Sequence, residues 1–265
     1  MVHPLLPLAE EFEEVPDLRC PTCKSGHLIR QEPFVLRGDA ASEQVKRVRP
    51  DVFEPDMIDG VFTGFLTCGR PTCGEHVAVA GGWRVGHPAT YEEEEYPDSF
   101  RLSYAQPALI LVDCPAGTPE SVVQACRAAA RIVWVDPAGA AGRLRLAVEE
   151  LLTAQKVSQA RITRKPGKPA KRVRRTTHER IVEFGTRKGK EQAGMVLEAV
   201  KWIGNAGSHE NALGLEDALE GAEMLGLALQ LLYDPSHPNL MRRVEAVIKR
   251  RGPAPRRTRR RTTVP

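Results

Sequence analysis

The spacing of apolar residues changes near residue 119. Before this point, short apolar stretches are separated by Gly and Pro, and the stretches 61–66 and 76–80 flank a turn that carries cysteines. Alternating apolar and polar positions predict strands, and two such stretches joined by a turn predict a β-hairpin. Residues 100–104 and 109–112 are further strand candidates. The first part of the chain is therefore expected to be β-rich.

Beyond residue 119, apolar residues recur with a period of about 3.6, which predicts amphipathic helices packed as a bundle. Asp136 before Pro137 is typical of a helix start, and Thr176 three residues before Glu179 is a capping-box pattern. The apolar stripes of the expected helices comprise Val122, Cys126, Ala129 and Val133; Leu144, Val148, Leu151 and Leu152; Ile181 and Phe184; Val196, Val200 and Ile203; Leu219, Ala222, Leu225, Leu229 and Leu232; and Leu240, Val244, Val247 and Ile248.

These patterns predict an α+β protein with a small β-rich N-terminal module, similar to a zinc ribbon, and an all-α helical bundle. We expect the β-rich module over residues 1–95 and an extended connector over 96–118. The bundle is expected over 119–234, interrupted by a basic loop at 157–175. Residues 235–265 are expected to form a last helix and a basic, disordered tail.

Composition limits the class of protein. Hydrophobic residues make up 42% of the chain, so cores can form and a wholly disordered chain is excluded. No apolar stretch approaches the roughly 18 residues that a membrane span requires. The N-terminal sequence MVHPLLPLAEEFEE lacks the basic start of a secretory signal. We therefore expect a cytoplasmic protein that does not enter a membrane.

Charge is strongly segregated along the chain. Residues 161–175 and residues 249–261 each carry eight Lys or Arg and no acidic residue. Without these sixteen positive charges, the net charge of +4 becomes −12 for the rest of the chain. Basic segments attract nucleic acids by releasing counterions. The alternative is that they are solvated, disordered segments that contact the acidic body.

Four of the six cysteines form two close pairs, Cys20 with Cys23 and Cys68 with Cys73. Turn-like spacing lets both pairs converge on one ion, and Zn²⁺ prefers a tetrahedron of thiolates. Four protein ligands leave no position for water, so this zinc would be structural. The sequence therefore predicts a structural zinc site in the β-rich module.

Other interpretations of the cysteines remain open. The second pair has four intervening residues instead of two, and either His27 or His76 could replace one cysteine. The thiols could also be buried without a metal, whereas a disulfide is disfavoured in a reducing cytosol. Cys114 and Cys126 are isolated in the sequence and are interpreted as small apolar residues.

Polar residues gather near the end of one expected helix and on another. In a continuing helix, Asn205 and His209 would lie on one face, and Arg145 and Glu149 have the same four-residue spacing. Gly204 would let the backbone turn or a ligand approach closely. We expect these side chains to form a functional polar site. The alternatives are a helix C-cap with a buried histidine and an ordinary Arg–Glu ion pair on the helix surface.

Three segments, 141–152, 201–209 and 232–234, resemble the bacterial domain-of-unknown-function 4145 family, which belongs to the HEPN-like group of helical domains associated with nucleotides and RNA. The most specific part is Ile-Gly-Asn-x-Gly-Ser-His, and the resemblance covers roughly residues 95–234. It implies a HEPN-like helical bundle, and a cysteine module at the N-terminus is common in that family.

Many HEPN-like proteins are metal-independent ribonucleases that pair an Arg with a His four to six residues later, often across a dimer interface. This sequence departs from that pattern, because residues 202–204 are not basic. Lys201 lies seven residues before His209. The candidate catalytic residues are His209, Asn205, Lys201, Arg145 and Glu149. The resemblance implies His209 as general acid or base, with Lys201 or Arg145 as its cationic partner.

Taken together, these features favour a non-catalytic nucleic-acid or nucleotide-binding module that acts in bacterial defence or regulation. RNA is expected more than DNA, with the basic loop and tail as the contact segments. One alternative is a metal-independent ribonuclease that uses His209 with Lys201 or Arg145. Another is a dimeric adaptor protein, and the resemblance implies a homodimer. Motifs typical of common NTPases, hydrolases and metalloproteases are missing from the sequence.

Overall fold

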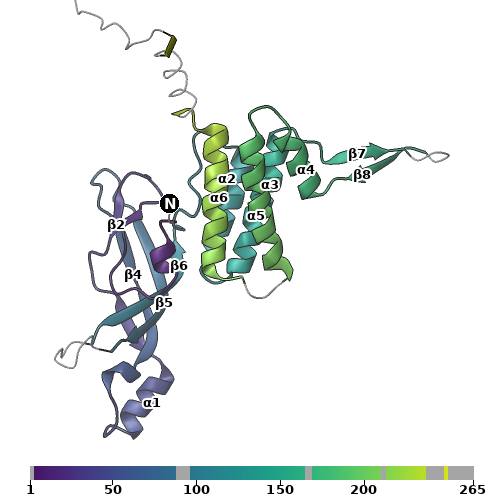
Figure 1. Ribbon diagram of the computed structural model, residues 1–265. Helices are drawn as coiled ribbons and strands as arrows, with labels where there is room; N and C mark the ends of the chain where they lie inside the picture. Colours follow the sequence, from purple (N-terminus) through teal and green to yellow (C-terminus); the bar gives the residue numbers. More distant parts are fainter. Residues whose placement is uncertain (1–2, 88–95, 165–168, 210–212, 237–247, 250–265) are drawn as a thin grey trace, which may run out of the picture.

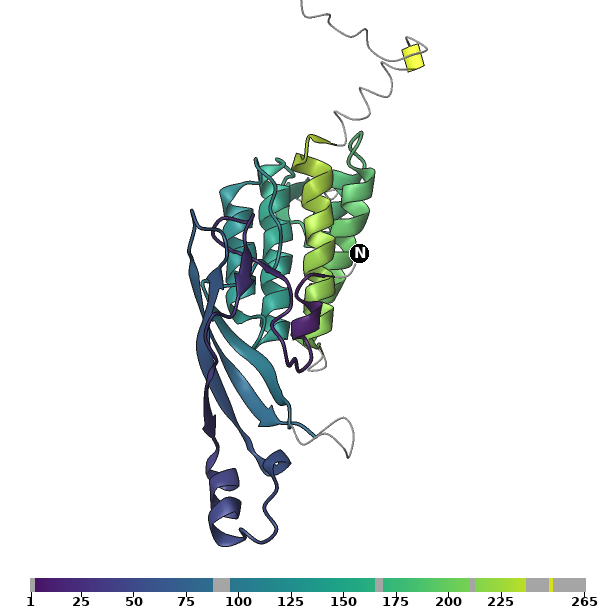
Figure 2. The ribbon, with the colours of Figure 1, turned by 90° about the vertical axis from the view of Figure 1, so that its left-hand side faces the viewer.

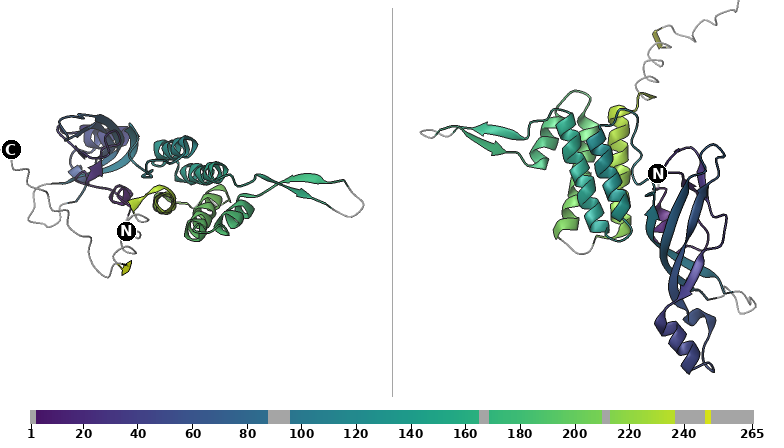
Figure 3. Two further views of the ribbon diagram at one scale, coloured as in Figure 1. Left: turned by 90° about the horizontal axis from the view of Figure 1, so that it is seen from above. Right: turned by 180° about the vertical axis from the view of Figure 1, so that it is seen from behind.

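The computed structural model describes residues 3–87, 96–164, 169–209, 213–236 and 248–249, with the side chains of 207–209 left out. The protein is α+β, as expected. A curled antiparallel sheet lies on one side of a group of helices, and a two-stranded hairpin projects from the other side (Figure 1; Figure 3, left). The sheet and the hairpin are therefore at opposite sides of the helical region.

The sheet is antiparallel throughout and has six strands. Five strands follow the order β1-β2-β4-β5-β6, while β3 pairs with the start of β4, on the edge where β2 pairs with its end. The strands are β1 (Leu18–Arg19), β2 (His27–Ile29), β3 (Val35–Gly38), β4 (Asp59–Cys68), β5 (His76–Val85) and β6 (Asp98–Gln106). The hairpin predicted from the sequence is confirmed as the β4–β5 pair.

The sheet core is built from aromatic rings at alternating positions. Phe62 of β4 and Phe100 of β6 are buried, and their ring centroids lie 5.2 Å apart. Phe34, just before β3, completes the cluster at 4.8 Å from Phe62 and 5.2 Å from Phe100. Phe65 of β4 points to the other face and is exposed. The alternation along β4 therefore places large apolar side chains in the core, as the period of two predicts.

The segment expected to connect the two parts contains a strand of the sheet. β6 confirms the strand predicted at 100–104 and belongs to the sheet rather than to a connector. The strand predicted at 109–112 is wrong, because these residues form no strand. Leu109 and Leu111 are nevertheless buried. Their apolar side chains pack at the junction of sheet and helices without backbone pairing, so apolar character alone misled the strand prediction.

A short helix, α1 (Ala40–Val48), lies at the end of the sheet farthest from the other helices (Figure 2). Asp39 caps it by accepting a hydrogen bond from the backbone N–H of Ser42 at 2.7 Å. The 3₁₀ turns η1 (Leu6–Leu8) and η2 (Pro55–Met57) complete the N-terminal part. This helix was not predicted from the sequence.

The helical region confirms the predicted helix starts. It contains α2 (Glu120–Ile132), α3 (Pro137–Ala154), α4 (Thr177–Gly185), α5 (Glu191–His209) and α6 (Leu215–Tyr233). Asp136 caps α3 at 2.7 Å from Gly139 N, and the capping box of Thr176 and Glu179 opens α4. α3 packs against α2, α5 and α6. Of the last predicted helix, residues 240–247 lie outside the described residues, as does the basic tail 250–265.

The segment expected as a basic loop forms an antiparallel hairpin of β7 (Ala160–Thr163) and β8 (Lys171–Arg174). The helical region is therefore not purely α. Ile162, Thr163 and Val173 are β-branched, and such residues favour strands. The backbone N–H of Arg175 closes the base of the hairpin on the carbonyl of Gln159 at 2.9 Å.

The N-terminal segment joins the sheet to the helices. His3 is buried, and its Nε2 donates to the carbonyl oxygen of Leu111 at 2.9 Å. Its Nδ1 accepts the backbone N–H of Leu5 at 3.1 Å. A cavity of about 600 Å³ lies between this segment and α6. Among the helices of the described part, none is long and apolar enough to cross a membrane.

Candidate metal centre and polar site

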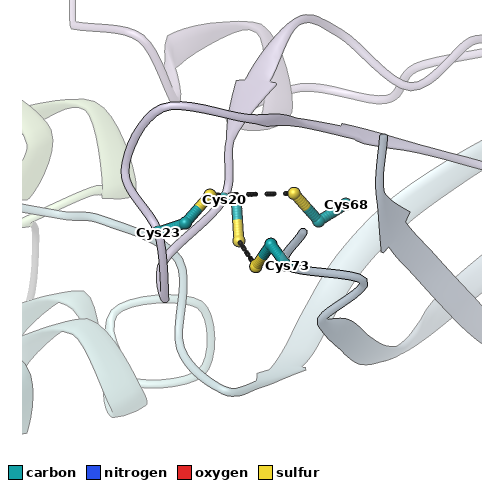
Figure 4. Close-up of side chains that lie close together, drawn as sticks. All are labelled: Cys20, Cys23, Cys68 and Cys73. Atoms are coloured by element: carbon teal, nitrogen blue, oxygen red, sulfur yellow. Dashed lines mark hydrogen bonds between the residues drawn. The ribbon is translucent and has the colours of Figure 1, made fainter. Parts of the chain in front are cut away.

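The four paired cysteines converge at one end of the sheet (Figure 4). All four sulfur atoms lie within 4.8 Å of one another. The Sγ atoms of Cys20 and Cys73 are 3.9 Å apart, and those of Cys23 and Cys68 are 3.8 Å apart. The four cysteines predicted from their spacing are therefore brought together and could hold a metal ion.

Two tight turns present the sulfur atoms. In the first turn, Cys20 donates its backbone N–H to the carbonyl of Gly26 at 2.8 Å and accepts that of Lys24 at 2.9 Å. Lys24 adopts a left-handed conformation with φ +56°. In the second, the backbone N–H of Cys73 donates to the carbonyl of Arg70 at 2.9 Å. Backbone hydrogen bonds within the two turns therefore help to hold the four sulfur atoms close together.

Gly26 allows the close approach of the two turns. Its backbone N–H donates to Sγ of Cys23 at 3.2 Å. A Cβ atom at this position would overlap Sγ of Cys68. A side chain is therefore excluded here by the position of the sulfur atom.

The electrostatics of the cluster favour a bound cation. Backbone N–H groups, first that of Ser25 and then that of Gly26, lower the pKa of Cys23 to about 6. The backbone N–H of Arg70 lowers the pKa of Cys68, but burial and the other three thiols outweigh it and raise this pKa to about 12. The thiols therefore resist joint ionisation, and a metal cation would favour the thiolate form of all four.

Neither histidine replaces a cysteine in this cluster. His27 pairs with Asp17 through its Nδ1, and Nδ1 of His76 lies 3.0 Å from Oγ1 of Thr67. All six cysteines are free, so the four thiols form no disulfide. Cys126 is buried in α2, as expected for a small apolar residue. With four sulfur ligands and no open position, the centre can support structure but has no place for a substrate.

The second candidate site lies where α3 meets α5. Guanidinium nitrogen Nη2 of Arg145 is 3.3 Å from Oε1 of Glu149, both on α3. Lys201 of α5 is 4% exposed, and its Nζ lies 3.9 Å from Oε1 of Glu198. Its Nζ also lies 3.5 Å from the ring centroid of Trp202. Burial lowers the pKa of Lys201, and the positive charge of Arg145 lowers it further, while Glu198 raises it.

The two helices approach closely at Gly204. A Cβ atom here would lie 2.7 Å from Cβ of Arg145 and 2.9 Å from the carbonyl oxygen of Ala141. α5 continues through Gly204 and the half-buried Asn205 to His209. Gly204 therefore lies inside the helix, where it allows close packing against α3, and does not end the helix. The side chain of His209 lies outside the described residues.

Glu149 takes part in more than a surface ion pair. It accepts the hydroxyl of Thr177 on α4 at 2.7 Å in addition to its contact with Arg145. Arg180 of α4 is 5% exposed and donates to the carbonyl of Glu149 at 3.3 Å. Its other terminal nitrogen donates to Oγ1 of Thr153 at 2.9 Å. This network ties α3 to α4.

Arg180 and Thr177 were not among the site residues predicted from the sequence. A usable signal was present, because Arg180 stands four residues before Phe184 and beside Ile181 on the buried stripe of a predicted helix. A charged residue in such a stripe is buried only when hydrogen bonds satisfy it. The network opens into a cavity of about 610 Å³ between α3, α4 and the base of the hairpin.

Comparisons with known families agree with this division into two parts. Residues 127–251 match a domain of unknown function, DUF4145. The resemblance found in the sequence is thereby supported for the helical region. Residues 10–108 match a second domain of unknown function, DUF8608, which spans all six strands of the sheet including β6. No curated protein and no solved structure matches the chain.

Proposed function

We propose that the protein binds nucleic acid, RNA in preference to DNA, through the β7–β8 hairpin and without cleaving it. The observation that carries this proposal is the charge of the projecting hairpin. Lys171, Arg172 and Arg174 are exposed on β8, and within the described residues no ion pair neutralises them. Arg161 of β7 pairs with Glu179 at 3.1 Å, and Arg175 pairs with Glu183.

The geometry of the hairpin suits a polyanion. It extends away from the sheet and the helices, so phosphates can approach without meeting the acidic remainder of the chain (Figure 3). On RNA, the cations of the hairpin would contact phosphates along a single strand or across the wide, shallow minor groove. The preference for RNA, a homodimeric state and a role in bacterial defence or regulation belong to the proposal through the resemblance of residues 95–234 to HEPN-like domains.

Fluorescence anisotropy with labelled RNA and DNA of one sequence tests the proposal. Replacing Lys171 and Arg172 by Gln should weaken RNA binding about tenfold and reduce the salt slope by about 1.4–1.8, because each phosphate contact contributes about 0.7–0.9. The control replaces Arg47 and Arg131, which are exposed and far along the sequence from the hairpin. Equal affinity of both variants, or no response to salt, contradicts the proposal.

We further propose that the ion held by the cysteines is Zn²⁺ in a structural role. A tetrahedron with Zn–S bonds of about 2.3 Å has sulfur atoms about 3.8 Å apart. Two of the sulfur pairs are 3.8 and 3.9 Å apart. Elemental analysis should therefore find one zinc per chain. Iron with visible absorption bands would contradict this assignment, because a tetrahedral set of four thiolates also suits iron.

A second candidate function is metal-independent RNA cleavage by His209. The observation in its favour is that Arg145 lies against Gly204, five residues before His209 on α5. A histidine can transfer protons while a nearby cation stabilises charge on the phosphate. Under this candidate, His209→Ala abolishes cleavage of a mixed RNA pool without magnesium and retains RNA binding. No cleavage by the wild type contradicts it and favours binding alone.

A further inference from the structure

The cavity at the base of the hairpin is rich in arginine. Four arginines line it, each from a different place in the fold: Arg145 from α3, Arg174 from β8, Arg175 from the link after β8 and Arg180 from α4. Only two acidic residues line the same cavity. The chain therefore gathers these cations around one open cavity.

Two of these arginines carry hydrogen-bond donors that the described part of the chain leaves unused. The Nε atoms of Arg145 and Arg180 are buried, and neither finds a partner among the described residues. Arg180 is 5% exposed, and its terminal nitrogens are fixed by the backbone of Glu149 and by Thr153. A buried N–H group without an acceptor costs free energy, so such groups are usually paired with protein, water or a ligand. Both Nε atoms are out of contact with solvent, so an anion in the cavity would first meet the outer guanidinium groups of Arg145 and Arg174, which keep exposed surface.

The lining of the cavity is net positive, because four arginines stand against Glu149 and Glu150, and this favours an anion. Glu149 is already engaged by Thr177 and Arg145, and Arg175 is paired with Glu183. Arg174 has no ion-pair partner in the described residues. A phosphate monoester carries a charge of about −1.5 to −2 at neutral pH, more than the single charge of an internal phosphodiester. The site therefore suits a terminal phosphate better than an internal one.

We infer that this cavity binds the terminal phosphate of a nucleic-acid strand that lies along the hairpin. The inference rests on the proposed nucleic-acid binding and adds the end of the strand as the group that is recognised. The cations of β8 lead from the hairpin to the cavity, because Arg174 belongs to both. A volume of about 610 Å³ is typical of small-ligand pockets and can admit a terminal nucleotide.

The test compares short labelled RNAs of one sequence that carry a 5′-phosphate, a 3′-phosphate or hydroxyls at both ends. One of the phosphorylated strands should bind about tenfold tighter than the hydroxyl strand, as expected for charged hydrogen bonds. Arg145→Gln should abolish this preference. Arg143→Gln is the matched control, because Arg143 is exposed on the same helix and does not line the cavity.

Lys171→Gln separates the inference from the proposed function. Because Lys171 lies on the hairpin and outside the cavity lining, its replacement should weaken all three RNAs equally and preserve the preference. If the wild type binds all three RNAs with equal affinity, the inference is overturned while nucleic-acid binding stands. Failure to bind any RNA overturns both. Should Arg145→Gln prove misfolded by circular dichroism, Arg174→Gln at an exposed position carries the same expectation.

Discussion

The sheet module and the helical region are held together in different ways. The helical region is filled by completely buried leucines from several helices, including Leu144, Leu151, Leu219 and Leu229. The sheet module relies on a small group of aromatic rings and, at its other end, on four thiols. Burial of apolar surface stabilises the helices without a metal, whereas an ion held by the four thiols would stabilise only the end of the sheet. Stability of the two parts should therefore respond to different treatments.

The polar groups of the sheet module and of the helical region also differ, in whether they leave room for a ligand. The four sulfur atoms of the sheet face one another and leave no open position for a further ligand. The four arginines Arg145, Arg174, Arg175 and Arg180 instead line an open cavity. The closed arrangement suits a structural role, and the open one suits ligand binding.

Removal of the metal should produce the largest difference in stability between the sheet module and the helical region. A strong chelator is expected to expose residues 18–29 and 67–76 to hydrogen exchange, while α3, α5 and α6 keep their protection. Zinc contributes about 10–16 kcal/mol to small thiolate sites, far more than a single packing contact. Cys23→Ser should reproduce the effect, and Cys114→Ser, which lies outside the cluster, should not. Equal loss of protection in both parts would contradict the contrast.

Gly26→Ala should weaken the metal centre without removing a ligand. The new Cβ atom would overlap Sγ of Cys68 and displace it. We expect metal affinity to fall by about 10–100-fold, the range for changes next to metal ligands, measured by competition with a chromophoric chelator. Gly69→Ala is the control, since its nearest neighbours would be 3.7 Å from the new atom. A similar loss of metal affinity in both variants would argue against the close approach of Gly26 to Sγ of Cys68.

Gly204→Ala should destabilise the helical region and leave the metal centre intact. The added atom would lie 2.7 Å from Cβ of Arg145 and 2.9 Å from the carbonyl of Ala141, so α3 and α5 must separate. Such overpacking costs about 1–3 kcal/mol. Gly226→Ala on α6 meets no atom within 4 Å and should instead stabilise by about 0.5–1 kcal/mol. Chemical denaturation measures the free energy of unfolding of both variants. A change of the same sign in both would be inconsistent with close packing at Gly204.

Acidification should have the smallest effect, at the junction of the two parts. Burial lowers the pKa of His3 below 6.5, although the Leu111 carbonyl and Glu223 raise it. The unfolded chain therefore binds a proton before the folded protein does. The free energy of unfolding should be unaffected by His3 above about pH 6.5 and should fall as the pH drops below this value. His3→Gln should show a smaller loss in melting temperature between about pH 7.5 and about pH 5.5. A loss as large as that of the wild type would exclude His3 as the cause.

Local signals in the sequence predicted much of the fold. The capping residues Asp136 and Thr176 start helices where expected, and the alternation along 61–66 and 76–80 forms the β4–β5 pair. These features depend on neighbours within a few residues. The spacing of the four cysteines also predicted their convergence, because the requirements of a metal are visible in residue type and separation.

Features that depend on distant contacts were not predictable in this way. The charge of residues 161–175 hid the β-branched residues that form β7 and β8. Gly204 was interpreted as a position for a turn or a ligand. In the structure, a side chain is excluded there because the backbone of α3 passes close to it. The role of Arg180 depends on acceptors in Glu149, Thr153 and Val157, which lie more than 20 residues away in sequence. Only the packing of α3 against α4 reveals it.

The hairpin of β7 and β8 leaves and rejoins the helical region at nearly the same point, since Arg175 and Gln159 are joined by one backbone hydrogen bond. A segment with adjacent ends can be lengthened, shortened or exchanged at little cost in loop-closure entropy. Related proteins could therefore acquire new binding partners by altering residues 160–174 while their helices remain unchanged. In protein engineering, the same feature makes this position suited to the insertion of a foreign peptide.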